Sequence, residues 1–84
     1  MAHPLNVLLV DDEPKICHIL EQILIARGCS VRLAHDGLEG LAQFQEQPAE
    51  VVITDIKMPR MGGLELVREL EHLDPLVNIV VITA

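Results

Sequence analysis

The sequence predicts an α/β fold built on one parallel sheet. Four short apolar segments, three of them continuous and rich in β-branched residues, alternate with three segments whose apolar residues recur with a helical period. Continuous apolar runs are typical of parallel strands that helices cover on both faces. Short links between alternating elements favour right-handed crossovers. A chain of 84 residues forms one domain at most.

The predicted strands are of two kinds. The segment 30–34 alternates Val31 and Leu33 with Ser30 and Arg32, which predicts an edge strand with one wetter face. The other three segments are continuous apolar runs, so we expect them to be buried on both faces. These runs are residues 7–10, 51–53 and 79–82.

The first predicted helix covers residues 14–27. Proline is tolerated in a first helical turn, which suits Pro14, and Gly28 is a typical residue at a helix end. The apolar residues follow the spacing i, i+3, i+4, i+7 and i+8, which predicts a helix with one apolar stripe. The stripe consists of Ile16, Ile19, Leu20, Ile23 and Leu24.

Two further helices follow the second and third strands. Asp36 is the expected N-cap of the second helix, Glu39 completes a capping box, and the helix ends near Glu46. The third helix ends near residues 74–75, because a residue before proline avoids the helical region. Its apolar stripe consists of Leu66, Val67, Leu70 and Leu73.

Composition and charge exclude several classes of protein. The net charge is −7 and the pI is near 4.8, the wrong sign for a surface that neutralises nucleic-acid phosphates. The longest apolar run is far below the ~18 residues of a membrane span, and no leader pattern opens the chain. We therefore expect a cytoplasmic protein with no direct contact to nucleic acid or membrane.

The cysteines and histidines do not suggest a metal site. Cys17 and Cys29 are 12 residues apart, with no CxxC spacing and no histidine at ligand spacing. We expect them to be ordinary, partly buried free thiols of a cytosolic protein. The histidines are scattered without pairing and are expected at the surface. They are His3, His18, His35 and His72.

Acidic residues follow two of the predicted strands. Asp11, Asp12 and Glu13 come directly after the first strand, and Asp55 follows the third. In a parallel sheet both positions lie at the carboxyl edge. If the first and third strands are neighbours and the second lies outside the first, the crossovers diverge there and open a crevice for ligands.

Carboxylates that converge in this way favour a cation. Two of them about 6 Å apart repel by about 3 kcal/mol at an effective dielectric constant of about 20. A hard divalent ion with oxygen ligands relieves this repulsion. The competing interpretation is that Asp11, Asp12 and Glu13 only stabilise a helix N-terminus, but it does not account for Asp55.

Three blocks of sequence resemble, in order and spacing, the signature blocks of bacterial response-regulator receiver domains. Each block alone is a weak signal, and three in register over the chain are strong. The resemblance implies a flavodoxin-like, receiver-type sheet with strand order 2-1-3-4 and helices on both faces, with residues 1–84 as the N-terminal two-thirds of the domain. The blocks are Val10-Asp11-Asp12-Glu13-Pro14, Thr54-Asp55-Ile56-Lys57-Met58-Pro59-Arg60-Met61-Gly62-Gly63 and Val81-Ile82-Thr83-Ala84.

The resemblance also implies a phosphorelay chemistry of a two-component system. Asp55 would accept a phosphoryl group from the phosphohistidine of a sensor histidine kinase. Asp12 and Asp55 would ligate Mg²⁺, Asp11 would act directly or through a water, and the backbone carbonyl of Lys57 would complete the protein ligands. Thr83 would donate its hydroxyl to the phosphoryl group and so move a nearby loop and helix. Receivers catalyse their own phosphorylation and dephosphorylation and are not conventional enzymes.

The chain departs from the family pattern in two respects. Gly62 stands where a capping Asp, Asn or Ser is usual, which costs only a few tenths of a kcal/mol. A complete receiver continues past Thr83 with a helix, a fifth strand that ends in a phosphate-binding lysine, and a last helix. Neither Lys15 nor Lys57 holds that lysine's position. The activity of this chain alone, and whether it is a fragment or the product of a shortened gene, stay open.

Two other hypotheses remain beside the leading one. The chain could be a truncated or degenerate receiver that acts only as an assembly module, since the apolar strand 78–82 would offer an unpaired edge to another copy. A metal-dependent phosphatase of the haloacid dehalogenase type also uses an aspartyl nucleophile after a strand. That family requires Asp-x-Asp, whereas this chain has Asp55-Ile56-Lys57 and adjacent Asp11-Asp12.

Overall fold

Seven elements alternate along the chain in the predicted order. The computed structural model describes residues 3–82. None of the helices in this range is long and apolar enough to cross a membrane. The elements are β1 (Asn6–Val10), α1 (Pro14–Ala26), β2 (Ser30–Ala34), α2 (Gly37–Glu46), β3 (Val51–Asp55), α3 (Gly63–Leu73) and β4 (Asn78–Ile82).

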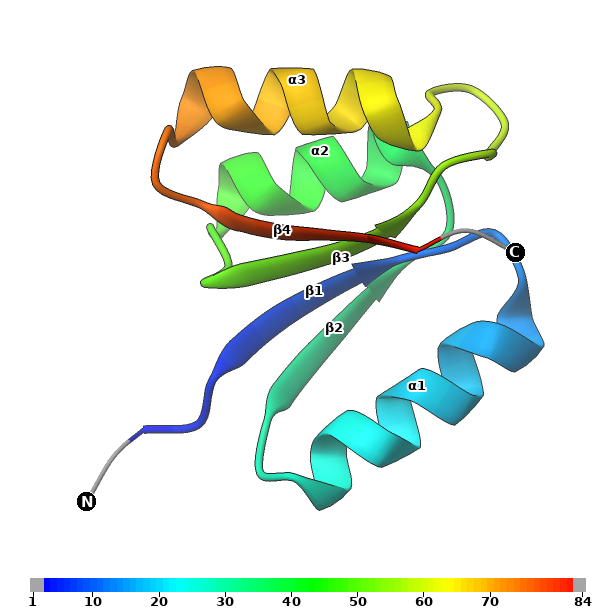
Figure 1. Ribbon diagram of the computed structural model, residues 1–84, viewed down its shortest axis with the longest axis vertical. Helices are drawn as coiled ribbons and strands as arrows, with labels where there is room; N and C mark the ends of the chain where they lie inside the picture. Colours follow the sequence, from blue (N-terminus) through cyan, green and yellow to red (C-terminus); the bar gives the residue numbers. More distant parts are fainter. Residues whose placement is uncertain (1–2, 83–84) are drawn as a thin grey trace.

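The four strands form one parallel sheet in the order β2-β1-β3-β4, which confirms the predicted strand order. Val10 pairs with Ala34 on one side and with Thr54 on the other, so β1, β2 and β3 end almost level. Helices α2 and α3 lie on one face and α1 lies on the other (Figure 1). The carboxyl ends of the strands therefore form a common edge.

The main core lies between the sheet and the pair α2 and α3. Full burial of a Leu or Val side chain contributes about 1.5–3 kcal/mol, so this layer supplies most of the stability. A Cβ on Gly40 would lie 3.0 Å from Val10 Cγ2, which shows how closely α2 approaches β1. The cluster consists of Leu8, Val10, Ala34, Phe44, Ala49, Val52, Met61, Leu66 and Leu70.

The element ends follow local chemistry and differ little from the predictions. Helix α1 ends at Ala26, one residue early, and Gly28 takes the left-handed φ of 87° that terminates it. Strand β3 continues two residues further than predicted, because Asp55 still pairs with Ile82 of β4. Gly62 caps α3 without a side-chain hydrogen bond, as predicted.

The start of α2 forms the predicted cap. The backbone N–H of Glu39 donates to Asp36 Oδ1 at 2.8 Å. The Glu39 carboxylate accepts in return from the backbone N–H of His35 at 2.6 Å, one residue before the cap itself. Two of the free N–H groups near the helix start are satisfied in this way.

The polar face of the edge strand β2 is less exposed to solvent than predicted. Arg32 is half-buried, and its guanidinium donates to the backbone carbonyls of Gln43 (3.4 Å) and Gln47 (2.6 Å) at the C-terminal end of α2. Helix α2 therefore covers the face of β2 that carries Arg32. The side chain binds the terminal carbonyls that the helix leaves without partners.

Strand β1 is buried on both faces, as its continuous apolar run predicts, whereas β4 is partly exposed, as expected of a strand with an unpaired edge. Val80 is 48% exposed and Val81 39% exposed. Strand β4 pairs only with β3, and α1 contacts β1 and β2. Val80 pairs with Ile53 and lies on the face that α1 covers, whereas Val81 lies on the opposite face. The half of the α1 face formed by β3 and β4 is open in the described residues.

The apolar stripe of α1 is only partly buried, for the same reason. Its sheet-facing side consists of Cys17, which is buried, and Leu20 and Leu24, which are half-buried. Four isoleucines on α1 are 40–54% exposed. They are Ile16, Ile19, Ile23 and Ile25.

Candidate functional site

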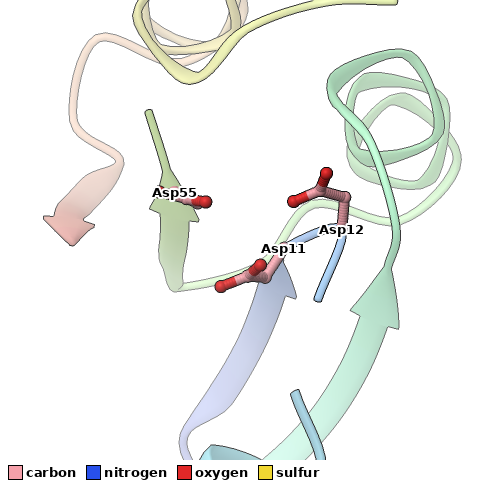
Figure 2. Close-up of side chains that lie close together, drawn as sticks. All are labelled: Asp11, Asp12 and Asp55. Carbon is pink, nitrogen blue, oxygen red and sulfur yellow. The ribbon is translucent and has the colours of Figure 1, made fainter. Parts of the chain in front are cut away.

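Three carboxylates meet at the carboxyl edge of the sheet. Asp11 and Asp12 directly follow β1, and Asp55 is the last residue of β3. One carboxylate oxygen from each lies within 4.8 Å of the others. Asp12 and Asp55 point toward each other above Asp11 (Figure 2). The structure thus brings together the three acids that the sequence predicted, at the point where the connections from β1 and β3 leave for opposite faces.

Asp11 forms the buried base of this acid cluster, which we define as Asp11, Asp12 and Asp55. It is 3% exposed, and its Oδ1 accepts a hydrogen bond from the backbone N–H of Glu13 at 2.9 Å. Its own N–H donates to the carbonyl of Ala34 in β2 at 3.0 Å. Asp12 is exposed, so the cluster opens from a buried floor to solvent.

The electrostatics of the cluster favour a cation. Burial raises the pKa of Asp11, and the charges of Asp55 and Asp12 raise it further, against the hydrogen bond from Glu13 that lowers it. The ionised form of Asp11 is therefore penalised in the folded chain. The donors are hard carboxylate oxygens, the kind of ligand that Mg²⁺ takes from proteins, and one or two of the three side chains suffice beside retained waters. The residues present fit a Mg²⁺ site.

Asp55 is held in a fixed orientation at the end of β3. Its Oδ1 accepts from the backbone N–H of Ile56 at 2.7 Å. The hydroxyl of the fully buried Thr54 donates to the Asp55 carbonyl at 2.9 Å. Within residues 3–82 the second carboxylate oxygen of Asp55 has no hydrogen-bond donor. This oxygen is therefore available to contact a ligand.

The β3–α3 loop, residues 56–62, begins directly after Asp55 of the cluster. It is closed at its base by a hydrogen bond from the Gly63 N–H to the Ile56 carbonyl, at 2.7 Å. A Cβ on Gly63 would lie 1.9 Å from the Asp55 carbonyl oxygen, so only glycine lets α3 begin this close to β3. Lys57 lies in this loop with an exposed side chain. Thr83 lies outside the described residues, and its role stays a prediction.

One contact near the cluster was not predicted. Arg60, in the β3–α3 loop, binds Asp36 through two contacts, Nε to Oδ2 at 3.0 Å and Nη2 to Oδ1 at 3.2 Å. The sequence placed Arg60 inside the second signature block without a role. Nothing in the local pattern pairs it with a helix cap 24 residues earlier.

The thiols and the histidines take no part in the cluster's donor set. Cys17 and Cys29 are free, as predicted, but Cys17 is buried rather than partly buried. Its Sγ contacts the Asp11 carbonyl at 3.2 Å, and burial raises its pKa to about 11, with the nearby acids adding to the shift. Cys17 is therefore a protonated, unreactive thiol at neutral pH. All four histidines are exposed, as predicted.

The fold defines a flavodoxin-like α/β protein with an acid cluster at the carboxyl edge of its sheet. Comparison with known proteins gives the family. The family described as the response regulator receiver domain matches residues 7–84. The chain belongs to this family, which operates in two-component signalling. Among curated relatives, the transcriptional regulatory protein TrcR of Mycobacterium tuberculosis is 37% identical over 81 residues, 96% of this chain and 32% of TrcR.

Solved structures agree with this assignment. The response regulator protein TrrA from Thermotoga maritima, in complex with Mg²⁺ and BeF, superposes with a TM-score of 0.92 at 35% identity, over 95% of this chain and 70% of that one. A chain of the CheX-CheY-BeF3-Mg²⁺ complex from Borrelia burgdorferi gives a TM-score of 0.94 at 29% identity, over 98% and 63%. The chain spans about a third of TrcR, so it corresponds to one part of that relative.

Proposed function

We propose that this chain is the phosphoacceptor module of a two-component response regulator. In this proposal Asp55 accepts a phosphoryl group from a phosphohistidine of a sensor histidine kinase in the cytoplasm. The observation that carries it is the acid cluster, in which the carboxylate oxygens of Asp11, Asp12 and Asp55 lie within 4.8 Å of one another. Family membership supports the same assignment.

The transfer requires one nucleophilic oxygen and charge neutralisation. The free carboxylate oxygen of Asp55 attacks the phosphorus, a P–O bond forms, and the P–N bond breaks with its electron pair returning to the imidazole, which takes up a proton. The backbone N–H of Ile56 holds the other oxygen and so orients the nucleophile. Bound Mg²⁺ supplies neutralisation of the charge that develops on the phosphoryl oxygens. Asp12, Asp55 and the carbonyl of Lys57 would hold it, with Asp11 acting directly or through a water.

Magnesium is expected to stabilise the folded chain. At ten times the dissociation constant the gain is about 1.4 kcal/mol, or roughly 5–10 °C in melting temperature for a domain of this size. Asp12→Ala should remove this gain and, because one repelling carboxylate is lost, should raise the melting temperature in the absence of metal. Glu71→Ala, which removes an exposed acid from α3, serves as the matched control and should keep the gain. A melting temperature that ignores millimolar Mg²⁺ would contradict the metal assignment.

The direct test is phosphorylation by a small acyl phosphate. We expect the chain to gain one phosphoryl group, detected by intact-mass spectrometry, only when Mg²⁺ is present. The adduct should be labile to hydroxylamine, as an acyl phosphate is. Incorporation that is equal with Mg²⁺ and with a chelator would contradict the proposed mechanism. No incorporation under either condition would favour the second candidate function.

That second candidate is an assembly module without chemistry, formed by self-association through β4. The specific observation in its favour is the exposure of Val80 and Val81 on a strand with one paired edge. An unpaired apolar edge is a template for another copy of the same chain. The two functions are compatible, since the acid cluster lies at the carboxyl edge of the sheet and the open edge runs along β4.

A further inference from the structure

We propose that Arg60 is a positioning residue for the metal and phosphoryl site. It acts by locking the β3–α3 loop to the start of α2. The inference rests on the proposed function, because that loop carries Lys57, whose backbone carbonyl is assigned to Mg²⁺. It is an inference about the order of this loop, and it can be tested with and without metal.

The loop lies directly against the start of α2. Met61 is 9% exposed and packs at Gly37, where a Cβ would lie only 2.3 Å from the Met61 carbonyl oxygen and 2.7 Å from the Met61 Cβ. One residue earlier, the Arg60 guanidinium reaches both carboxylate oxygens of Asp36. A planar two-contact pair fixes direction as well as distance, which a single contact does not.

Asp36 is itself a rigid anchor for this pair. Its side chain is 17% exposed, and Oδ1 already accepts the backbone N–H of Glu39 at 2.8 Å. That hydrogen bond lowers the pKa of Asp36, with the contacts to Arg60 lowering it further. Asp36 therefore stays ionised at neutral pH, and the pair joins the loop to a helix end that does not move freely.

The position of the pair explains why it bears on the acid cluster. Strand β1 lies between β2 and β3. The pair connects the loop after β3 with the helix start after β2, and so passes the end of β1, where Asp11 and Asp12 stand. The link therefore holds together the two segments that flank the cluster on the face of α2 and α3 (Figure 1).

The backbone of Arg60 supports a role for its side chain. Its φ is 69°, the one left-handed non-glycine residue in the described range. This region disfavours any residue that carries a Cβ, and glycine would adopt it at lower cost. The ion pair with Asp36 is the interaction that arginine adds at this position, and it offsets the strain.

Whether Arg60→Gln raises or lowers the affinity for Mg²⁺ distinguishes a positioning role of Arg60 from a purely electrostatic one. Removing a cation near three acids strengthens Mg²⁺ binding if only the electric field matters. We expect Arg60→Gln to weaken it instead, by about three- to fivefold, the range that corresponds to a partly exposed ion pair. Titration calorimetry measures the dissociation constant. Arg68→Gln on α3 removes the same charge from an exposed site and should leave binding unchanged or slightly stronger.

Two more variants complete the test. Arg60→Gln combined with Asp36→Asn restores the net charge of −7 and keeps an N-cap, because asparagine caps as well as aspartate. Positioning predicts that this double variant binds Mg²⁺ as weakly as Arg60→Gln alone. Binding equal to that of the unmutated chain overturns the inference. Arg60→Lys should restore part of the affinity, since lysine keeps the charge but not the two-contact geometry.

A metal-free measurement keeps the inference distinct from the proposed function. Arg60→Gln should speed exchange of the Gly63 amide, which closes the base of the loop, several-fold relative to the amide of Val52 in the core of β3. Unchanged exchange together with unchanged Mg²⁺ affinity overturns the positioning role. Faster exchange in a chain that binds no Mg²⁺ supports the lock and contradicts the metal site instead.

Discussion

Changing Asp55 to asparagine is expected to abolish phosphoryl incorporation from an acyl phosphate. The amide oxygen of asparagine can still accept the Ile56 N–H, so the local structure survives, but it is not a nucleophile at phosphorus. Asp11→Asn should lower the rate by only about ten- to a hundredfold. This is the range for residues that contact the ligands or waters of a metal rather than the metal itself. Radiolabel or intact mass after a fixed incubation gives both values.

A matched control exists at the opposite end of α3. Asp74 accepts the backbone N–H of Leu76 at 3.0 Å, and Asp74→Asn makes the same chemical change far from the cluster. It should leave incorporation intact. Label that persists on the Asp55→Asn chain at the level of the unmutated chain would refute the assignment of the phosphoacceptor.

The order of elements could be predicted because each one has a local signal. Asp36 with Glu39 marks the start of α2, and the alternation around Val31 marks β2 as an edge strand. The exact ends of the helices and strands were harder to predict from the sequence. Strand β3 extends to Asp55 because of its pairing with Ile82, a contact between residues 27 positions apart that no local pattern encodes.

The burial of individual side chains was predicted less well than the elements. Periodicity placed Ile16, Ile19 and Ile23 on one apolar stripe, and all three are 40% exposed or more. A helical period shows which residues share a face, but the width of the buried part depends on what covers it. Here α1 packs mainly against β1 and β2.

The candidate site also has a part that the sequence predicts and a part that it does not. Asp11, Asp12 and Asp55 could be predicted together because each follows a strand, and parallel strands end at one edge. The contact of Arg60 with Asp36 could not, since it joins a loop residue in a left-handed conformation to a helix cap across the end of a third strand. Sequence signals thus located the acid cluster and left out the contact between Arg60 and Asp36.

The 84-residue chain is expected to self-associate through β4 at micromolar concentration. Val80 and Val81 are about half and about two-fifths exposed, and the outer edge of β4 has no partner strand in residues 3–82. Covering a Val or Ile side chain of this kind contributes about 1 kcal/mol when half of its surface is already buried. Backbone groups of the open edge add hydrogen bonds to a second copy. Both copies gain, so a dimer or larger assembly is favoured over a monomer.

A charged residue on the open edge should reverse this. Val80→Lys is expected to weaken association by about tenfold, because a charge must be buried or repelled at the contact. Leu76→Lys is the matched control, since Leu76 is equally apolar and 87% exposed but lies in the loop before β4. Analytical ultracentrifugation measures both. A monodisperse monomer of the unmutated chain, with slowly exchanging amides over residues 79–82, would show that β4 is protected without a second copy and would contradict the prediction.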